Sequence, residues 1–206
     1  LDDVQVGAAG SLNSSAAVNE TAQDMVHGAF DAASALDLRP YNYGSYASTV
    51  NNAIGRAYYG LYGSLSFLIE TRGIGAGRMT LERRVIAQYV VVQSLIGYVV
   101  DHADEVVQQV AQGREAVAAA GASYDESDSL VLTHGVSQQN GYTIVRPKWD
   151  LGTGECVDAN ATGTIYRYDI AERVRPRPTA YVLPRGEEWA ETAASIMETN
   201  GVSFYT

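Results

Sequence analysis

The sequence predicts an α/β protein, and three patterns carry this prediction. Apolar residues recur every three or four positions over 15–36 and again over 80–120, which is the spacing of amphipathic helices. A compact apolar run at 65–69 has the length of a buried strand. Over 130–183, short runs rich in Val, Ile, Thr and Tyr alternate with Gly, Asn, Asp and Pro, which is typical of strands joined by turns.

Composition narrows the classes of function. The chain has 206 residues, of which 46% are hydrophobic, so it is long enough to bury a sizeable core. Its 24 acidic residues outnumber 14 basic ones, and the net charge of -10 predicts no nucleic-acid partner and no anionic membrane partner. The single cysteine, Cys156, excludes an internal disulfide and a metal site built from several thiolates.

The first predicted helix covers 15–36 and has an N-cap between Asn13 and Ser15. Its expected buried stripe consists of Val18, Ala22, Met25, Ala29, Ala33 and Leu36. Arg39 and Pro40 end this helix. The tyrosine- and glycine-rich stretch 41–62 has little periodicity, so a loop containing one short helix is expected there.

The predicted strand at 65–69 ends at Glu70 and leads into a glycine-rich turn at 73–77. Thr80 is expected to cap a helix that continues to about residue 100. Because apolar residues occupy more than one side of this helix, we expect burial on most sides. Its apolar run is too short for a membrane span, which needs ~20 residues. A more polar helix should follow over 101–120.

The last third is expected to be β-rich and to end in a helix and a strand. The predicted strands lie at 130–132, 142–145, 163–168, 179–183 and 202–205. A helix is expected over 187–199, with its inward side formed by Trp189, Ala193, Ile196 and Met197.

Glu70 is the ionisable residue with the best claim to chemistry, because strand ends are where α/β sheets place ligands. Position alone favours a structural ion pair with Arg72 over catalysis. The run Gly73-x-Gly75-x-Gly77 does not have the spacing of a dinucleotide-binding turn, so a plain turn is expected.

The remaining polar candidates are interpreted as solvated groups. His102 and Glu105 have the spacing of a metal-binding pair on a helix, but no third ligand accompanies them. His27 is placed on a polar helix face and His134 in a loop. Cys156 is interpreted as an ordinary free thiol. A solvated turn is also expected for the acidic cluster of Asp125, Glu126 and Asp128.

Two segments resemble the zinc metallocarboxypeptidases of the carboxypeptidase A/B type, and the surrounding stretch is similar to their bacterial branch. They are Tyr41-Asn42-Tyr43-Gly44-Ser45 and Ser66-Phe67-Leu68-Ile69-Glu70-Thr71-Arg72. The resemblance implies the C-terminal part of a mixed-sheet α/β sandwich with a β-rich appendage. On that basis, 1–125 forms the C-terminal half of the catalytic domain, and 126–206 forms the β-rich region.

The resemblance also implies a role for each site residue. Glu70 corresponds to the general base and acid that acts on zinc-bound water during peptide hydrolysis at a substrate C-terminus. Tyr46, Tyr58 and Arg72 are the substrate-binding candidates. The family's zinc ligands precede its catalytic glutamate, so we expect them upstream of Leu1, with no metal ligand in this chain. The partners expected are therefore a peptide substrate and the missing N-terminal half of the domain, without which the chain is expected to be inactive.

Two alternatives stay open beside the carboxypeptidase hypothesis. One is a non-catalytic binding or structural domain of the same fold that has lost the metal site. The other is an amidohydrolase relative that cleaves acyl or peptidoglycan-like amides. An upstream sequence without zinc ligands favours the first alternative, and activity restricted to blocked peptides favours the second.

Overall fold

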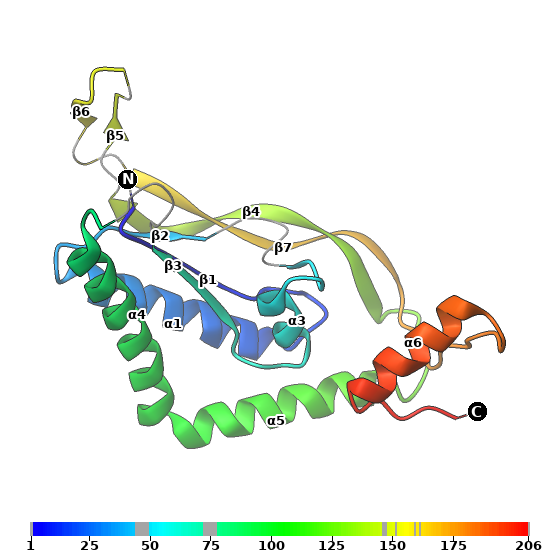
Figure 1. Cartoon of the computed structure of the whole chain (residues 1–206). Coiled ribbons are helices and arrows are strands. Elements are labelled where there is room, and N and C mark those ends of the chain that lie inside the picture. The colour runs from blue at the N-terminus through cyan, green and yellow to red at the C-terminus, as the bar shows by residue number, and fades with distance from the viewer. Residues whose placement is uncertain are drawn as a thin grey trace.

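The computed structural model describes residues 2–43, 50–71, 78–145, 148–150, 152–158, 160 and 162–205. Helices and strands are both present, which confirms the α/β class. A small sheet and two long helices form a layered body, and a long β-hairpin runs beside it (Figure 1).

The central sheet has the strand order β2-β1-β3, formed by Pro40–Asn42, Val4–Ala8 and Phe67–Thr71 respectively. β1 runs parallel to β2 and antiparallel to β3, so the sheet is mixed. The strand β2 lies in the stretch expected to be a loop with one short helix. Its three residues carry little strand signal of their own, and pairing with β1 holds them extended.

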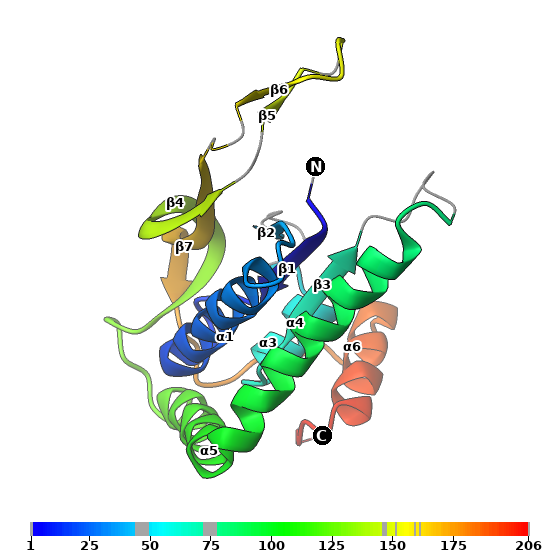
Figure 2. The ribbon, with the colours of Figure 1, turned by 90° about the vertical axis from the view of Figure 1, so that its left-hand side faces the viewer.

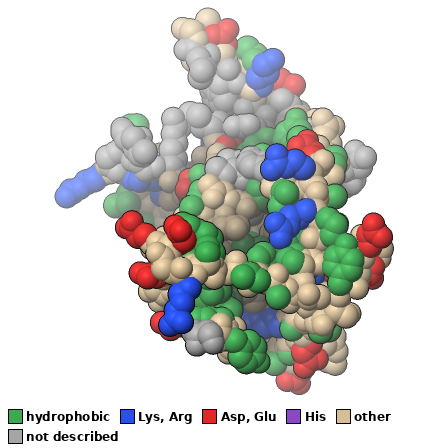
Figure 3. Space-filling model, turned by 90° about the vertical axis from the view of Figure 1, so that its right-hand side faces the viewer, with side chains coloured by type: hydrophobic (Ala, Val, Ile, Leu, Met, Phe, Trp, Pro, Cys, Tyr) green, Lys and Arg blue, Asp and Glu red, His purple; other side chains and the backbone are tan. Residues whose placement is uncertain are grey.

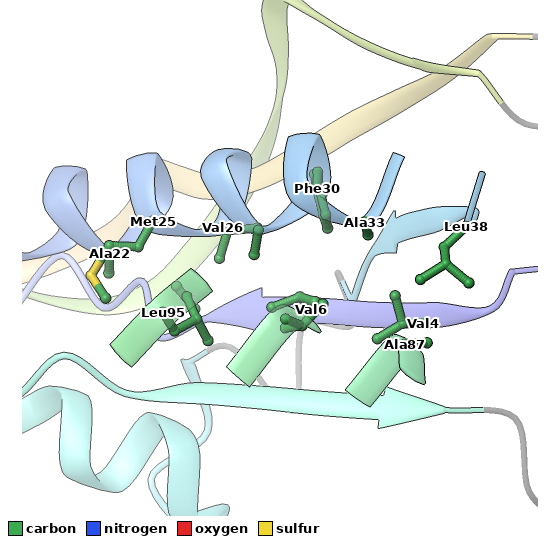
Figure 4. Packing of buried hydrophobic residues seen from close by; sticks show 13 residues of the cluster. Val4, Val6, Ala22, Met25, Val26, Phe30, Ala33, Leu38, Ala87 and Leu95 are labelled. Atoms are coloured by element: carbon green, nitrogen blue, oxygen red, sulfur yellow. The ribbon is translucent and has the colours of Figure 1, made fainter. Parts of the chain in front are cut away.

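The helix α1, Ala16–Ser34, confirms the first predicted helix and its cap. The Ser15 hydroxyl accepts a hydrogen bond from the Val18 amide. The expected stripe is buried except at Leu36, which lies beyond the end of the helix and is exposed. The stripe packs over β1, with Val4, Val6 and Phe30 at the centre of the core (Figure 4).

The helix α4, Leu81–Asp101, packs against α1 and β3 on the same face of the sheet (Figure 2). Its cap differs from the prediction, because Thr80 has a left-handed backbone and its side chain makes no capping hydrogen bond. Asp3 instead fixes this end of the helix, since Arg83 donates to both of its carboxylate oxygens at 2.8 Å. Burial raises the pKa of Asp3, but Arg83 and Arg39 lower it on balance.

The burial expected around α4 is wrong for the described residues. Only Ala87, Val91 and Leu95 are buried on this helix. Most of its other apolar side chains are exposed, although Tyr98 packs against the edge of the core and Val90 and Val92 are half-buried. The following helix α5, Ala103–Ala120, turns away from α4 by 84°. Within the described ranges, no single helix could cross a membrane, and α4 and α5 meet the length and hydropathy criteria only as this bent pair.

The C-terminal third is dominated by one antiparallel hairpin, in which β4, Ser129–Val145, pairs with β7, Thr162–Pro176. Two short strands, β5 and β6, at Lys148–Trp149 and Cys156–Asp158, pair beyond it (Figure 1). The shorter strands expected at 130–132 and 142–145 belong to one continuous β4. We call β4 to β7 the arm.

The end of the chain matches the predicted helix but not the predicted strands. α6 spans Glu188–Thr199, whereas 179–183 and 202–205 form no strand because neither finds a pairing neighbour. The short helix α3, Gly55–Leu61, confirms the expected helix within the tyrosine-rich stretch. Trp189 and Ile196, expected to face inward on α6, are exposed. Hydrophobic side chains are spread over the face of the molecule that Figure 3 shows.

Candidate functional site

Glu70 is the fourth of the five residues of β3 and lies opposite Gln5 of β1. Alternation along β1 turns Val4 and Val6 toward the helices, so Gln5 and its partner Glu70 belong to the opposite face of the sheet. Glu70 is exposed while the other side chains of β3 are half-buried. The strand therefore holds the Glu70 carboxylate in a defined position that a molecule in solution can reach.

A buried arginine lies on the same face of the sheet. Arg56 of α3 is only 5% exposed, and a Cβ atom added to Gly7 would overlap its Nη1 atom. Gly7 pairs with Leu68, so Arg56 contacts the sheet two residues along from the pair formed by Gln5 and Glu70. The cation thus lies against the surface that carries the carboxylate.

Tyr43 and the charge of Glu70 both raise the pKa of this buried arginine. Arg56 Nη1 donates to the Tyr43 carbonyl at 3.4 Å, and its guanidinium lies 5.4 Å from the centre of the Tyr43 ring. Burial lowers the pKa of Arg56 to about 10, and the nearby Tyr43 and Glu70 partly oppose this shift. Because this pKa is still well above 7, Arg56 supplies a full positive charge at neutral pH.

Arg56 is the candidate site residue that the sequence interpretation missed. A usable signal was present, because Arg56 is the only charged residue between Arg39 and Glu70. A lone charge within an apolar and tyrosine-rich stretch needs a partner when the stretch folds against the core. The separation of Arg56 and Glu70 in the sequence does not show that they share one face of the sheet, because Arg56 belongs to a helix and Glu70 to a strand.

Tyr58 lies on α3 but does not share the orientation of Arg56. Two helical positions separate them by about 200° around the axis, so the two side chains leave opposite sides of α3. The Tyr58 hydroxyl donates to Asn200 Oδ1 at the end of α6 and also contacts the Tyr62 hydroxyl at 3.3 Å. The structure thus joins Tyr58 to α6 and gives it no contact with Glu70. Tyr46 and Arg72 lie outside the described residues.

The histidine and glutamate pair expected to be solvated is indeed exposed. His102 Nδ1 lies 3.4 Å from Glu105 Oε2, and the imidazole ring stacks on Tyr98. Cys156 is an exposed free thiol, as expected. Asp125 belongs to a turn in which the Ser127 hydroxyl and amide donate to its carboxylate, and these hydrogen bonds lower its pKa. In the part of the chain that the structure describes, no three His, Cys, Asp or Glu side chains gather as a metal site.

His134 differs most from its prediction. It lies in the strand β4 rather than in a loop, and it is 7% exposed rather than solvated. Its Nε2 atom accepts a hydrogen bond from the Leu12 amide at 3.1 Å, and burial lowers its pKa. His134 borders a cavity of about 370 Å³ together with Ser11, Asn13, Val50, Asn51, Asn52, Val131 and Leu132. Because Asn13 and His134 bond to neighbouring backbone, these two residues join the arm to the body.

Two curated proteins show a distant similarity to this chain. It is 30% identical over 134 residues to Carboxypeptidase 2 of Trichophyton tonsurans and, to the same extent, to Carboxypeptidase 2 of Trichophyton equinum. The matched stretch is 64% of this chain and only 23% of the length of each relative. No family model matches the chain, and no solved structure matches it. The similarity is a carboxypeptidase-like relationship that covers about a quarter of each relative.

Proposed function

We propose that this chain is the C-terminal portion of a zinc-dependent metallocarboxypeptidase of the bacterial branch, with Glu70 as its general base and acid. One observation carries the proposal: Glu70 is exposed at a fixed position on a sheet face that also bears the buried cation Arg56. The distant similarity to two proteins named Carboxypeptidase 2 supports the same class. Glu70 takes a proton from the attacking water and returns it to the departing amine.

Zinc, which the resemblance implies, does not fit the described part of this chain. No group of three His, Cys, Asp or Glu is found there, and the pair formed by His102 and Glu105 is exposed on the bend between α4 and α5. The zinc ligands of the proposed enzyme therefore come from residues upstream of Leu1, and this chain contributes only the proton transfer and part of the substrate-binding surface.

Arg56 gives the sheet face that carries Glu70 an electrostatic preference. A peptide with a free C-terminus presents a carboxylate, and the positive charge of a guanidinium buried beneath this face attracts that group. Arg56 therefore joins Tyr46 and Arg72 as a substrate-binding candidate. Tyr58 is the weaker candidate, because its hydroxyl already bonds to Asn200.

The test compares Glu70→Gln with Glu82→Gln in the longer protein encoded by the reading frame that contains Leu1. Glu82 is an exposed carboxylate in the first turn of α4, so it controls for loss of one surface charge. We expect kcat/KM on a peptide with a free C-terminus to fall roughly 10²- to 10⁴-fold in Glu70→Gln and to stay unchanged in the control. Undiminished hydrolysis by Glu70→Gln contradicts the assignment.

The same assay separates the two alternatives. Hydrolysis of C-terminally blocked peptides, with none of free ones, indicates the amidohydrolase relative. A folded wild-type protein without hydrolase activity indicates the non-catalytic domain. Metal analysis gives an independent readout: the 206-residue chain should retain no zinc after gel filtration, and one tightly held equivalent contradicts the placement of the ligands upstream.

A further inference from the structure

The cavity of about 370 Å³ beside His134 lies where the arm meets the body. Its described lining comes from the loop before α1, the segment before α3 and the strand β4. The cavity is at the end of β1 away from Glu70, because Ser11 follows the last residue of β1, whereas Glu70 pairs with Gln5 near its beginning. Pockets that hold small ligands have volumes of about 300 to 1,000 Å³, so a small ligand has room here.

The described lining carries no charge at neutral pH. It contains one serine, three asparagines and one histidine beside the apolar Val50, Val131 and Leu132. Burial lowers the pKa of His134 below its ordinary value of 6.5, so its imidazole is neutral at pH 7. An ion that enters such a site loses hydration and finds no opposite charge. The lining therefore favours a neutral ligand that has polar groups and a small apolar part.

Three of the polar lining residues have hydrogen-bonding groups that no described residue uses. Ser11 is 3% exposed, and its hydroxyl accepts from the Asn13 amide but has no acceptor for its own proton in the described ranges. Asn51 accepts from the Ala53 amide through Oδ1, which leaves its side-chain NH₂ group available. The Asn52 side chain makes no hydrogen bond to any described residue. The cavity therefore offers donors from Ser11 and Asn51, and both a donor and an acceptor from Asn52.

The asparagine side chains suit a peptide backbone. A side-chain amide presents one donor and one acceptor side by side, and so does an extended peptide. The lining already contains such a pairing, since Asn13 donates to the Val131 carbonyl at 2.9 Å and accepts from the Val131 amide at 2.8 Å. Asn52 has the same group without a partner. No aromatic ring is among the described lining residues, so they provide no surface on which a nucleobase could stack.

We propose that this cavity binds a short neutral peptide, with the Asn52 side chain paired to its backbone and the apolar part of the lining around a small aliphatic side chain. The site is separate from Glu70 and does not depend on the proposed peptidase chemistry. Such a peptide contacts the body through Asn52 and the arm through Leu132. Its binding therefore ties the arm to the body.

The experiment titrates the 206-residue chain with a trialanine peptide that carries an acetyl group at one end and an amide at the other, so that neither end is charged. Binding is followed through the backbone amide signals in NMR spectra. We expect the signals of Ser11, Asn52 and Leu132 to shift, and hydrogen exchange in β4 to slow at least threefold when the peptide is bound. N-acetylglucosamine is titrated in parallel as a neutral saccharide.

One variant on each side of the cavity tests the contacts. Asn52→Ala should weaken binding of the capped peptide at least threefold, because a hydrogen bond to the peptide is lost. Leu132→Ala, on the arm, should weaken it by a similar factor through lost apolar contact. Gln108→Ala and Val136→Ala are the matched controls, since both side chains are exposed and neither lines the cavity. These two variants should bind the peptide as the wild-type chain does.

Three results overturn the proposal. The first is an absence of shifts at the lining residues at millimolar concentrations of the capped peptide. The second is equal affinity of the wild-type chain and Asn52→Ala, whose unfolding midpoint should not change because Asn52 bonds to no described residue. The third is binding of N-acetylglucosamine without binding of the peptide, which identifies a saccharide site instead. None of these readouts involves hydrolysis or Glu70, so they are independent of the proposed function.

Discussion

The body of the molecule and its arm are held together by different forces. In the body, β1, α1 and α4 enclose an apolar core in which Val6, Ala29 and Phe30 are almost inaccessible to solvent. In the arm, every described side chain of β7 is exposed apart from the half-buried Arg167 and Tyr168. The arm is attached through polar contacts to backbone and to Glu20. The difference predicts that the body resists unfolding by burial, whereas the arm can detach locally.

The largest effect should come from the core of the body. Phe30→Ala removes a fully buried ring between α1 and β1, and we expect the free energy of unfolding to fall by about 3 to 5 kcal/mol. Urea unfolding followed by circular dichroism measures this loss. Val182→Ala, at an exposed position near the C-terminus, should change it by less than about 0.5 kcal/mol. Equal effects of the two substitutions mean that the core does not dominate stability.

A smaller effect is expected where the arm meets the body. The Asn13 side chain donates to the Val131 carbonyl at 2.9 Å and accepts from the Val131 amide at 2.8 Å. Asn13→Ala leaves both backbone groups without this partner, at a cost of about 1 to 3 kcal/mol. We expect faster hydrogen exchange in β4 while the amides of α1 stay protected. Faster exchange throughout α1 as well contradicts local detachment.

The smallest effect is a pH dependence of the same junction. Burial lowers the pKa of His134 from its ordinary 6.5, so the unfolded chain binds this proton more readily than the folded one. The contribution of neutral His134 to the free energy of unfolding is therefore fully present above pH 6.5. It is lost as the pH falls toward the lowered pKa of His134 in the folded state. Unfolding midpoints should therefore fall as the pH is lowered from about 7.5 to about 5.5. These two pH values lie about one unit on either side of the ordinary pKa of histidine. The unfolding midpoint of His134→Gln should depend less on pH. If its pH dependence is unchanged, another titratable group causes it.

Local patterns predicted the body better than the arm. The helices α1 and α4 follow from a periodicity that each segment carries by itself, and Glu70 was found because an apolar run leads directly to it. The strand β2 could not be found in this way, since its pairing partner β1 lies about 35 residues earlier in the chain. The same reason explains why the arm is one long hairpin: cross-strand pairing continues through turn-like residues such as Gly135.

The candidate site also has one part that local sequence predicts and one part that it does not. The position of Glu70 on a strand depends on neighbouring residues. The presence of Arg56 on the same face of the sheet depends on how α3 folds back over β1. His134 was misplaced because its burial comes from the loop that precedes α1, which is more than 100 residues away in sequence. In both cases a polar residue is buried by a distant segment, and no local spacing encodes that contact.

The contact between Gly7 and Arg56 also constrains how this protein can change over evolution. Any side chain at position 7 would overlap both the guanidinium of Arg56 and the carbonyl of Tyr43. A lineage that loses the arginine still has the backbone carbonyl of Tyr43 against position 7, so room for a side chain there also requires this backbone to move. Homologous sequences that keep the packing of Tyr43 against β1 should therefore keep glycine at position 7, with or without the arginine.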